Sequence, residues 1–91
     1  MKSRTQELIT FNFSQPNLMK NVFLVGDFNQ WKVGADPMQQ MSNGSFRRTK
    51  KLLSGRYEYK FYADGIYWED LDAKVQTMNS YGTRNAVVTV G

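Results

Sequence analysis

The 91-residue chain contains no cysteine and no histidine, and these two absences remove most metal and nucleophilic chemistry. Without cysteine there are no disulfides and no thiolate ligands, so packing alone must hold the fold together. Without histidine, the usual catalytic triads and histidine-ligated zinc sites are excluded. We therefore expect neither a metal nor a cofactor.

Long apolar runs are also missing. No segment approaches the roughly 18 apolar residues that a membrane span needs, so we expect no membrane partner. Residues 1–7 lack the apolar stretch of a secretory signal. Together with the absence of cysteine, this leads us to expect a cytoplasmic location. The same features fit a segment cut from a longer protein.

The apolar residues that are present alternate with a period typical of strands, and no stretch shows sustained helical periodicity. Ile9, Phe11 and Phe13 share one face before a break at residues 14–17. The expected strands are residues 7–13, 22–25, 38–41, 46–53, 56–63, 66–68 and 85–90. About seven short strands indicate an all-β, immunoglobulin-like sandwich of the early-set type, formed as a single domain by residues 1–91.

Residues 56–63 form the clearest of these strands. Tyr57, Tyr59 and Phe61 are expected to face inward, and Glu58, Lys60 and Tyr62 to face outward. Asp64 and Gly65 follow directly and give a strong turn signal. This strand therefore has one aromatic face for a core and one mixed polar face for solvent or a ligand.

The net charge is +4, with basic residues concentrated at Arg47, Arg48, Lys50, Lys51 and Arg56. A basic strand with aromatics nearby is able to follow a phosphate backbone. A solvated edge strand, protected by its charges against sheet-to-sheet association, is the favoured interpretation. Nucleic acid is therefore not an expected partner.

Two strand–turn signatures about thirty residues apart each deliver large aromatic side chains to the end of a strand. Residues 22–31 read VFLVGDFNQW, and residues 57–68 read YEYKFYADGIYW. A small core gains little from indoles placed beyond turns, where water reaches them. A site that presents a flat apolar surface to a ligand gains a great deal, so this arrangement indicates a binding module.

The same motifs resemble a known family. Residues 26–31 (GDFNQW), residues 55–61 (GRYEYKF) with the turn Asp64–Gly65, and residues 80–90 (SYGTRNAVVTV) look like the glycogen-binding domain of carbohydrate-binding module family forty-eight. That family includes the β-subunit module of AMP-activated protein kinase and the N-terminal modules of isoamylases and branching enzymes. The resemblance covers about residues 20–90 and implies a β-sandwich.

What this resemblance implies is non-catalytic binding of α-glucans such as glycogen, starch or maltooligosaccharides. Indole and phenol planes would cover the C–H faces of glucose rings, and polar side chains would meet the hydroxyls at the ring edge. The residues that match the family's binding positions are Trp31, Lys60, Tyr67, Tyr81, Thr83 and Asn85. A glucan-active enzyme or a kinase is the implied protein partner.

Several positions leave alternatives open. Tyr67 and Trp68 are adjacent on a strand and must face opposite ways, and the motif favours Tyr67 as the ligand-facing residue. Tyr81 stands where the kinase-type module usually has an aliphatic residue, so it either widens the stacking surface or packs internally. Arg48 and Lys50 occupy inward positions that are usually apolar, so either their stems pass a sandwich edge or the register slips locally.

Catalysis is not expected from this chain. Glu69, Asp70 and Asp72 cluster, but an acid–base pair needs a cleft that a sandwich of this size rarely builds, and loop-type calcium spacing is missing. We interpret these three residues as solvated turn residues. The alternative to glucan binding is a protein-interaction module with a degenerate sugar site, docking through the strand at residues 47–51 or through exposed aromatics.

Overall fold

A computed structural model of the chain describes residues 5–14 and 21–91. In these residues the chain is nearly all β, with one short 3-10 helix, η1 (Asp27–Asn29). The strands are β1 (Gln6–Phe13), β2 (Val22–Gly26), β3 (Asp36–Pro37), β4 (Gln39–Gln40), β5 (Phe46–Leu53), β6 (Gly55–Ala63), β7 (Ile66–Trp68), β8 (Val75–Met78) and β9 (Arg84–Val90). The part of the chain that the structure describes holds no helix long and apolar enough to cross a membrane.

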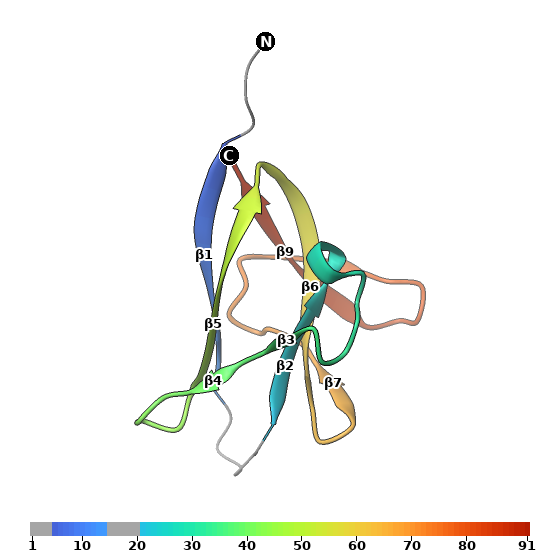
Figure 1. The fold of residues 1–91 in the computed structure, drawn as a ribbon. Coiled ribbons are helices and arrows are strands. Elements are labelled where there is room, and N and C mark those ends of the chain that lie inside the picture. The colour runs from blue at the N-terminus through green and yellow to red at the C-terminus, as the bar shows by residue number, and fades with distance from the viewer. Residues whose placement is uncertain (1–4, 15–20) are drawn as a thin grey trace.

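The strands form two antiparallel sheets that pack as a β-sandwich, which confirms the predicted fold class (Figure 1). One sheet has the order β1-β5-β4, and the other has the order β3-β2-β6-β9-β8, with β7 also paired to β6. The long strand β6 therefore pairs with β2, β7 and β9. Side chains on the outer face of β6 consequently meet residues from distant parts of the sequence.

Aromatic side chains from both sheets fill the space between the layers. Phe11 of β1 meets Tyr59 of β6 edge-on, with ring centroids 4.9 Å apart. Phe13 meets Phe61 at 4.7 Å, and Phe61 is fully buried. Each such aromatic pair adds about 0.5–1.5 kcal/mol beyond the apolar area it buries. This packing fixes the inward face of β6, so its outward residues, Lys60 among them, lie on the opposite face of the sheet.

The strand count differs from the expected seven, because the described residues contain nine strands. Asp36 and Pro37 lie outside the expected strands, yet they pair with Leu24 and Phe23 of β2. The strand β8 was missed altogether. Its sequence, VQTM, is too short and too polar to carry a period of its own, and it is a strand because β9 pairs along its whole length. Of the expected break at residues 14–17, residues 15–17 lie outside the described residues.

The basic strand β5 has a strand on both sides only at Phe46 and Arg47, and among the described residues only β1 pairs with it from position 48 onward, so the edge-strand interpretation holds for part of its length. It lies between β1 and β4, with Asn12 of β1 and Gln39 of β4 both opposite Arg47. Its alternation holds without a slip in register, because Phe46 and Leu52 are buried and the residues between them alternate. The inward positions 48 and 50 therefore carry cations toward the other layer.

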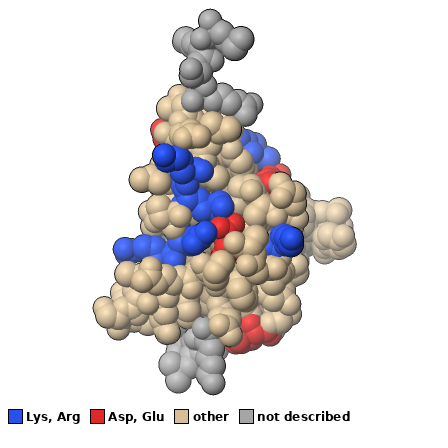
Figure 2. All heavy atoms as spheres, in the orientation of Figure 1, with Lys and Arg blue, Asp and Glu red and all other residues tan. Residues whose placement is uncertain are grey.

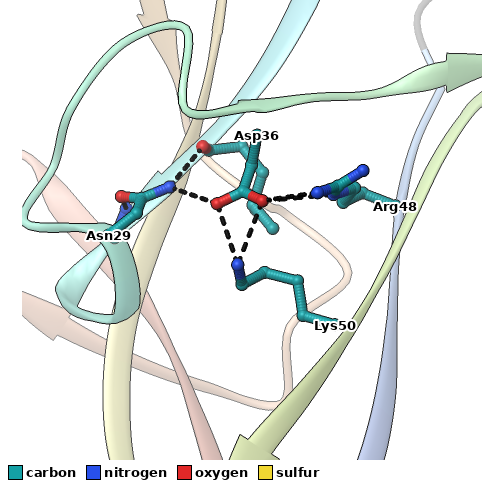
Figure 3. A network of polar contacts seen from close by, with 6 residues as sticks. Asn29, Asp36, Arg48 and Lys50 are labelled. Carbon is teal, nitrogen blue, oxygen red and sulfur yellow. Dashed lines mark hydrogen bonds and ion pairs between the residues drawn. The ribbon is translucent and has the colours of Figure 1, made fainter.

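Those two cations converge on one buried carboxylate, that of Asp36, which is only 3% exposed (Figure 3). Arg48 Nη2 lies 2.8 Å from Asp36 Oδ1, and Lys50 Nζ lies 3.0 Å from both carboxylate oxygens. Asn29 Nδ2 donates to Asp36 Oδ2 at 2.7 Å. The network joins β5 of the three-stranded sheet to β3, the edge strand of the six-stranded sheet, and the Arg48 side chain remains 38% exposed there.

Burial acts to raise the pKa of Asp36. The hydrogen bonds from Asn29, Lys50 and Arg48, with the charge of Lys50, outweigh it and hold that pKa below its ordinary value. The carboxylate is therefore ionised at neutral pH, and its ion pairs connect the two layers.

Candidate functional site

A cavity of about 700 Å³ opens beside the outward face of β6. Its volume falls in the range of small-molecule binding sites. All six residues singled out from the sequence line it, together with one further residue. The lining residues are Trp31, Lys60, Tyr67, Asn79, Tyr81, Thr83 and Asn85. They come from the loop after η1, from β6, β7 and β9, and from the β8–β9 loop. The antiparallel topology thus gathers side chains that are up to 54 residues apart.

The aromatic residues at the cavity remain accessible to water. Tyr81 is 90% exposed and Tyr67 is 50% exposed, and Trp31 is partly exposed. Tyr81 therefore does not pack internally. The Tyr62 ring supports the Tyr67 ring edge-on, with centroids 4.9 Å apart. Trp68 faces the other way, packs against the core and donates from Nε1 to the carbonyl of Ala63. Wide apolar surfaces are thus available to a ligand.

Trp31 is held by an unusual local backbone. Gln30 and Trp31 both have left-handed conformations, with φ of 56° and 58°. For residues other than glycine this conformation costs about 1–2 kcal/mol each. The cost is offset locally, because Trp31 N donates to the carbonyl of Gly26 at 2.9 Å and Trp31 Nε1 donates to Asp27 Oδ1 at 3.0 Å. Backbone strain of this kind is typical of functional sites, and here it sets the position of the Trp31 side chain.

Asp27 and Gly26 complete this support. Asp27 Oδ2 accepts from the backbone N–H of Glu58 at 2.8 Å, so one carboxylate joins the Trp31 ring to β6. A Cβ on Gly26 would lie 2.6 Å from the carbonyl oxygen of Glu58 and 2.8 Å from Cβ of Tyr59. Only glycine allows the loop to approach β6 this closely. The contact of Asp27 with the indole was not predicted from the sequence.

The polar half of the site is a chain of hydrogen bonds among side chains. Lys60 Nζ donates to Thr83 Oγ1 at 2.6 Å, and Asn79 Nδ2 donates to the same oxygen at 2.7 Å. Asn79 Nδ2 also lies 3.0 Å from Asn85 Oδ1. Asn85 Nδ2 in turn donates to Glu58 Oε1 at 3.0 Å. The hydrogen bond from Asn85, followed by that from Arg56, holds the pKa of Glu58 below its usual value, so this carboxylate is ionised at neutral pH.

Asn79 is the cavity residue that sequence reasoning did not find. Its Oδ1 accepts from the backbone N–H groups of Tyr81 and Thr83, at 2.9 and 3.2 Å, and closes the β8–β9 loop. Gly82 has a φ of 83° in the same loop and donates to the carbonyl of Asn79. An asparagine three residues before a glycine is a turn signal that was available in the sequence.

The clustered carboxylates do structural work in their turns. Asp70 Oδ2 accepts from the hydroxyl of Tyr59 at 2.6 Å, and Asp70 Oδ1 accepts from the backbone of Asp72. Burial, followed by the hydrogen bond and charge of Asp70, raises the pKa of the Tyr59 phenol far above its ordinary value. Glu69 accepts from the backbone of Arg84. No group of carboxylates suited to a metal ion occurs in the described residues.

Comparison with known proteins gives one family and two curated relatives. The family described as the glycogen recognition site of AMP-activated protein kinase matches residues 9–91. Protein PTST homolog 2, chloroplastic, of Arabidopsis thaliana is 31% identical over 88 residues, which are 96% of this chain and 16% of the relative. Protein FLOURY ENDOSPERM 6, chloroplastic, of Oryza sativa subsp. japonica is 32% identical over 84 residues, which are 92% of this chain and 15% of the relative.

These relatives bear on two expectations. The chain spans about one sixth of their length, which agrees with a module that occurs within longer proteins. The expected cytoplasmic location is wrong, because both relatives are chloroplastic proteins by name. The absence of cysteine and of a leader-like stretch did not identify the compartment.

Proposed function

The chain belongs to the family of the glycogen recognition site of AMP-activated protein kinase, and on this premise we propose that the cavity beside β6 is its glucan-binding site. The chain is a carbohydrate-binding module of family forty-eight that binds α-glucans, as predicted. The observation that carries the assignment of the site is the convergence of Trp31, Lys60, Tyr67, Tyr81, Thr83 and Asn85 on one cavity. The alternative of a protein-interaction module with a degenerate sugar site is not favoured.

The two halves of the cavity suit the two surfaces of a glucose chain. Trp31, Tyr67 and Tyr81 offer aromatic surface against which pyranose C–H faces are able to lie. Lys60, Thr83 and Asn85 offer polar groups for the hydroxyls at the ring edge. Because Tyr67 and Tyr81 are exposed, a polysaccharide is able to enter and leave without opening the fold.

The expected affinity is modest. Covering about 100 Å² of sugar face on each of two aromatics gives roughly 5 kcal/mol at the standard transfer coefficient. The loss of translational and rotational freedom offsets that much or more. Hydroxyls exchange water for protein partners, so their bonds add little. We expect micromolar to millimolar dissociation constants that fall as the glucan lengthens and meets more of the rings.

We also propose that the module has no catalytic role. The carboxylates Glu69 and Asp70 hold backbone and phenol groups in place, so they are poorly suited to act as an acid–base pair. Binding then serves to hold the remainder of a longer protein, or a glucan-active enzyme or kinase that accompanies it, at a glucan surface. Co-sedimentation of such a partner with glycogen should be lost with Trp31→Ala, and sedimentation that is unaffected would contradict this role.

By analogy with its two chloroplastic relatives, we propose that the full-length protein acts in the plastid. Fractionation of the source cells with antibody detection tests this directly. The protein should follow a stromal marker, and recovery with a cytosolic marker would exclude the proposal.

Intrinsic fluorescence tests the site itself, because the chain has two tryptophans with different roles. Maltoheptaose should change the emission of the native module and of Trp68→Phe, in which Trp31 is the remaining indole. Trp31→Ala should show no sugar-dependent change, although its Trp68 still fluoresces from the core. Retention on a glycogen column should be lost with Trp31→Ala and kept with Trp68→Phe. A Trp31→Ala protein that elutes as late as the native one would refute the proposed site.

A further inference from the structure

The hydrogen bonds around Asn79 have a fixed direction. Its Oδ1 accepts from the backbone N–H groups of Tyr81 and Thr83, and a backbone N–H only donates. The amide oxygen must therefore face the loop, and Nδ2 must face the cavity. This settles the orientation of the amide by chemistry, since oxygen and nitrogen are otherwise hard to distinguish.

The same direction is fixed independently at the other end of the chain of hydrogen bonds. Glu58 is an ionised carboxylate that only accepts, so Asn85 must turn Nδ2 toward it and Oδ1 away. Asn85 Oδ1 then lies 3.0 Å from Asn79 Nδ2, an acceptor facing a donor. Two groups of fixed polarity, one at each end, therefore agree on a single arrangement.

This arrangement determines how the Thr83 hydroxyl is able to bond. A hydroxyl has two acceptor lone pairs and one hydrogen. Lys60 Nζ, which only donates, and Asn79 Nδ2 occupy both lone pairs of Thr83 Oγ1, at 2.6 and 2.7 Å. The hydroxyl hydrogen therefore needs an acceptor other than Lys60 and Asn79. Because Thr83 lines the cavity, a ligand there is able to supply that acceptor.

Lys60 adds donors of the same kind. It is only 7% exposed, and the ion pairs found among the described residues do not include it. One of its three N–H groups points to Thr83, which leaves two that need acceptors. Because Lys60 lines the cavity, an oxygen of a ligand is able to accept from the N–H groups that Thr83 does not use.

We propose that Asn79 is a positioning residue that fixes the Thr83 hydroxyl as a hydrogen-bond donor to the ligand, so that the site selects a glucose unit through the acceptor lone pairs of one of its oxygens. This inference rests on the proposed function and deepens it. It assigns a direction to the hydrogen bond, and it places Asn79 in the site through Thr83 without requiring that Asn79 touch the sugar.

Sugars with single hydroxyl replacements measure that direction. Methyl α-maltotriosides carrying hydrogen or fluorine in place of the 2-, 3- or 6-hydroxyl of the central glucose are titrated against the labelled module by NMR, which measures weak binding. Hydrogen removes both donor and acceptor, whereas fluorine keeps a weak acceptor. At one position the deoxy sugar should bind about tenfold more weakly, and the fluoro sugar no more than about threefold more weakly.

Asn79→Asp should abolish the preference for the fluoro sugar over the deoxy sugar. The aspartate still accepts from the Tyr81 and Thr83 backbone, but its second oxygen now accepts from the Thr83 hydroxyl, which turns the hydroxyl hydrogen away from the cavity. That oxygen also faces Asn85 Oδ1, a second acceptor, so the affinity for every sugar should fall as well. Fluorine and hydrogen at that sugar position should then weaken binding equally. Asn43→Asp is the matched control, because Asn43 closes another exposed turn by accepting from Ser45 N and carries the same charge change. It should keep the native preference.

Thr83→Val provides a second test that does not depend on the folding of Asn79→Asp. Without the hydroxyl, the difference between the fluoro and deoxy sugars should disappear, and its persistence would overturn the inference. Equal losses for both sugars at every position in the native module would also overturn it, while leaving glucan binding intact. Failure of the native module to bind unmodified maltoheptaose would refute the proposed function itself.

Discussion

At the scale of single residues, the site depends on side chains that hold other side chains. Asp27 illustrates this best, because its two carboxylate oxygens have different partners. Oδ1 accepts from Trp31 Nε1 and Oδ2 accepts from the backbone N–H of Glu58. Gln30 and Trp31 have left-handed backbone conformations just after η1, and the Asp27 carboxylate orients the Trp31 indole.

Replacing Asp27 with asparagine should therefore weaken glucan binding without unfolding the module. An asparagine has one acceptor oxygen where the carboxylate has two, so either the indole or the Glu58 N–H loses its partner. We expect the dissociation constant for maltoheptaose to rise about three- to tenfold, as measured by calorimetry or affinity electrophoresis in glycogen.

The control for this substitution is Asp64→Asn in the turn between β6 and β7. Asp64 has a left-handed φ of 55°, which asparagine adopts readily. It does not line the cavity, so its affinity for maltoheptaose should match that of the native module. Equal weakening by both substitutions would show that charge alone, and not the contact with Trp31, governs binding.

At the scale of elements, the network around Asp36 connects the layers at one point. Asp36 belongs to β3, a strand of two residues, while Arg48 and Lys50 belong to β5 of the other sheet. Lys50 also lies over the ring of Phe28, 5.5 Å from its centroid. This places polar contacts between sheets where the family pattern usually has apolar ones.

Asp36→Asn should lower the free energy of unfolding by about 2 kcal/mol at pH 7, because hydrogen bonds to a charged group are replaced by weaker ones. The pKa of Asp36 in the folded protein lies below its ordinary value of 3.8. The contribution of Asp36 to stability is therefore complete above pH 3.8 and is lost as the pH falls from there through the folded pKa. Urea unfolding at pH 7 and near pH 3 should show the difference between native and variant shrinking with acidity.

Asp72→Asn is a suitable control for the Asp36 measurement, because Asp72 is an exposed carboxylate in the connection between β7 and β8. Its unfolding free energy should stay within about 0.5 kcal/mol of the native value. A stability difference for Asp36→Asn that persists unchanged at low pH would show that packing, rather than ionisation, is responsible.

The elements also show what the sequence was able to predict. Strand β6 and its two faces followed from a clear alternation, and the inward placement of Arg48 and Lys50 followed from the alternation of β5. Their partner did not, because Asp36 lies in the opposite sheet and the pairing depends on tertiary structure. Strand β8 was missed for the same reason, since its pairing with β9 and not its own residues makes it a strand.

The candidate site divides in a similar way. Six cavity residues were predicted from motifs and from the outward face of β6, and their roles in binding stay predictions that the experiments above address. Asn79 was not predicted, because its importance comes from backbone groups of its own loop and from Thr83. Contacts that run between side chains across a loop leave only a weak trace in the spacing of residue types.

At the scale of the whole molecule, the exposed basic residues of β5 and the cavity lie on different faces, and Lys60 is the cation that lines the cavity among the described residues. Figure 2 shows Lys and Arg side chains gathered on the side where β5 runs. Arg47 and Lys51 are exposed on the outer face of the three-stranded sheet, whereas Lys60 and the cavity are on the outer face of the six-stranded sheet. The exposed cations of β5 therefore contribute little at the glucan site.

Ionic strength should consequently have little effect on glucan binding. Raising NaCl from 50 to 500 mM shortens the screening length severalfold, yet a neutral sugar releases no counterions. The dissociation constant for maltoheptaose should change less than about twofold, measured by calorimetry at both salts. A double-stranded DNA ligand held by four phosphate contacts would lose more than about a thousandfold over the same range. Arg47→Glu and Lys51→Glu should leave the maltoheptaose affinity unchanged, and a strong effect of either would place the ligand on the basic face instead.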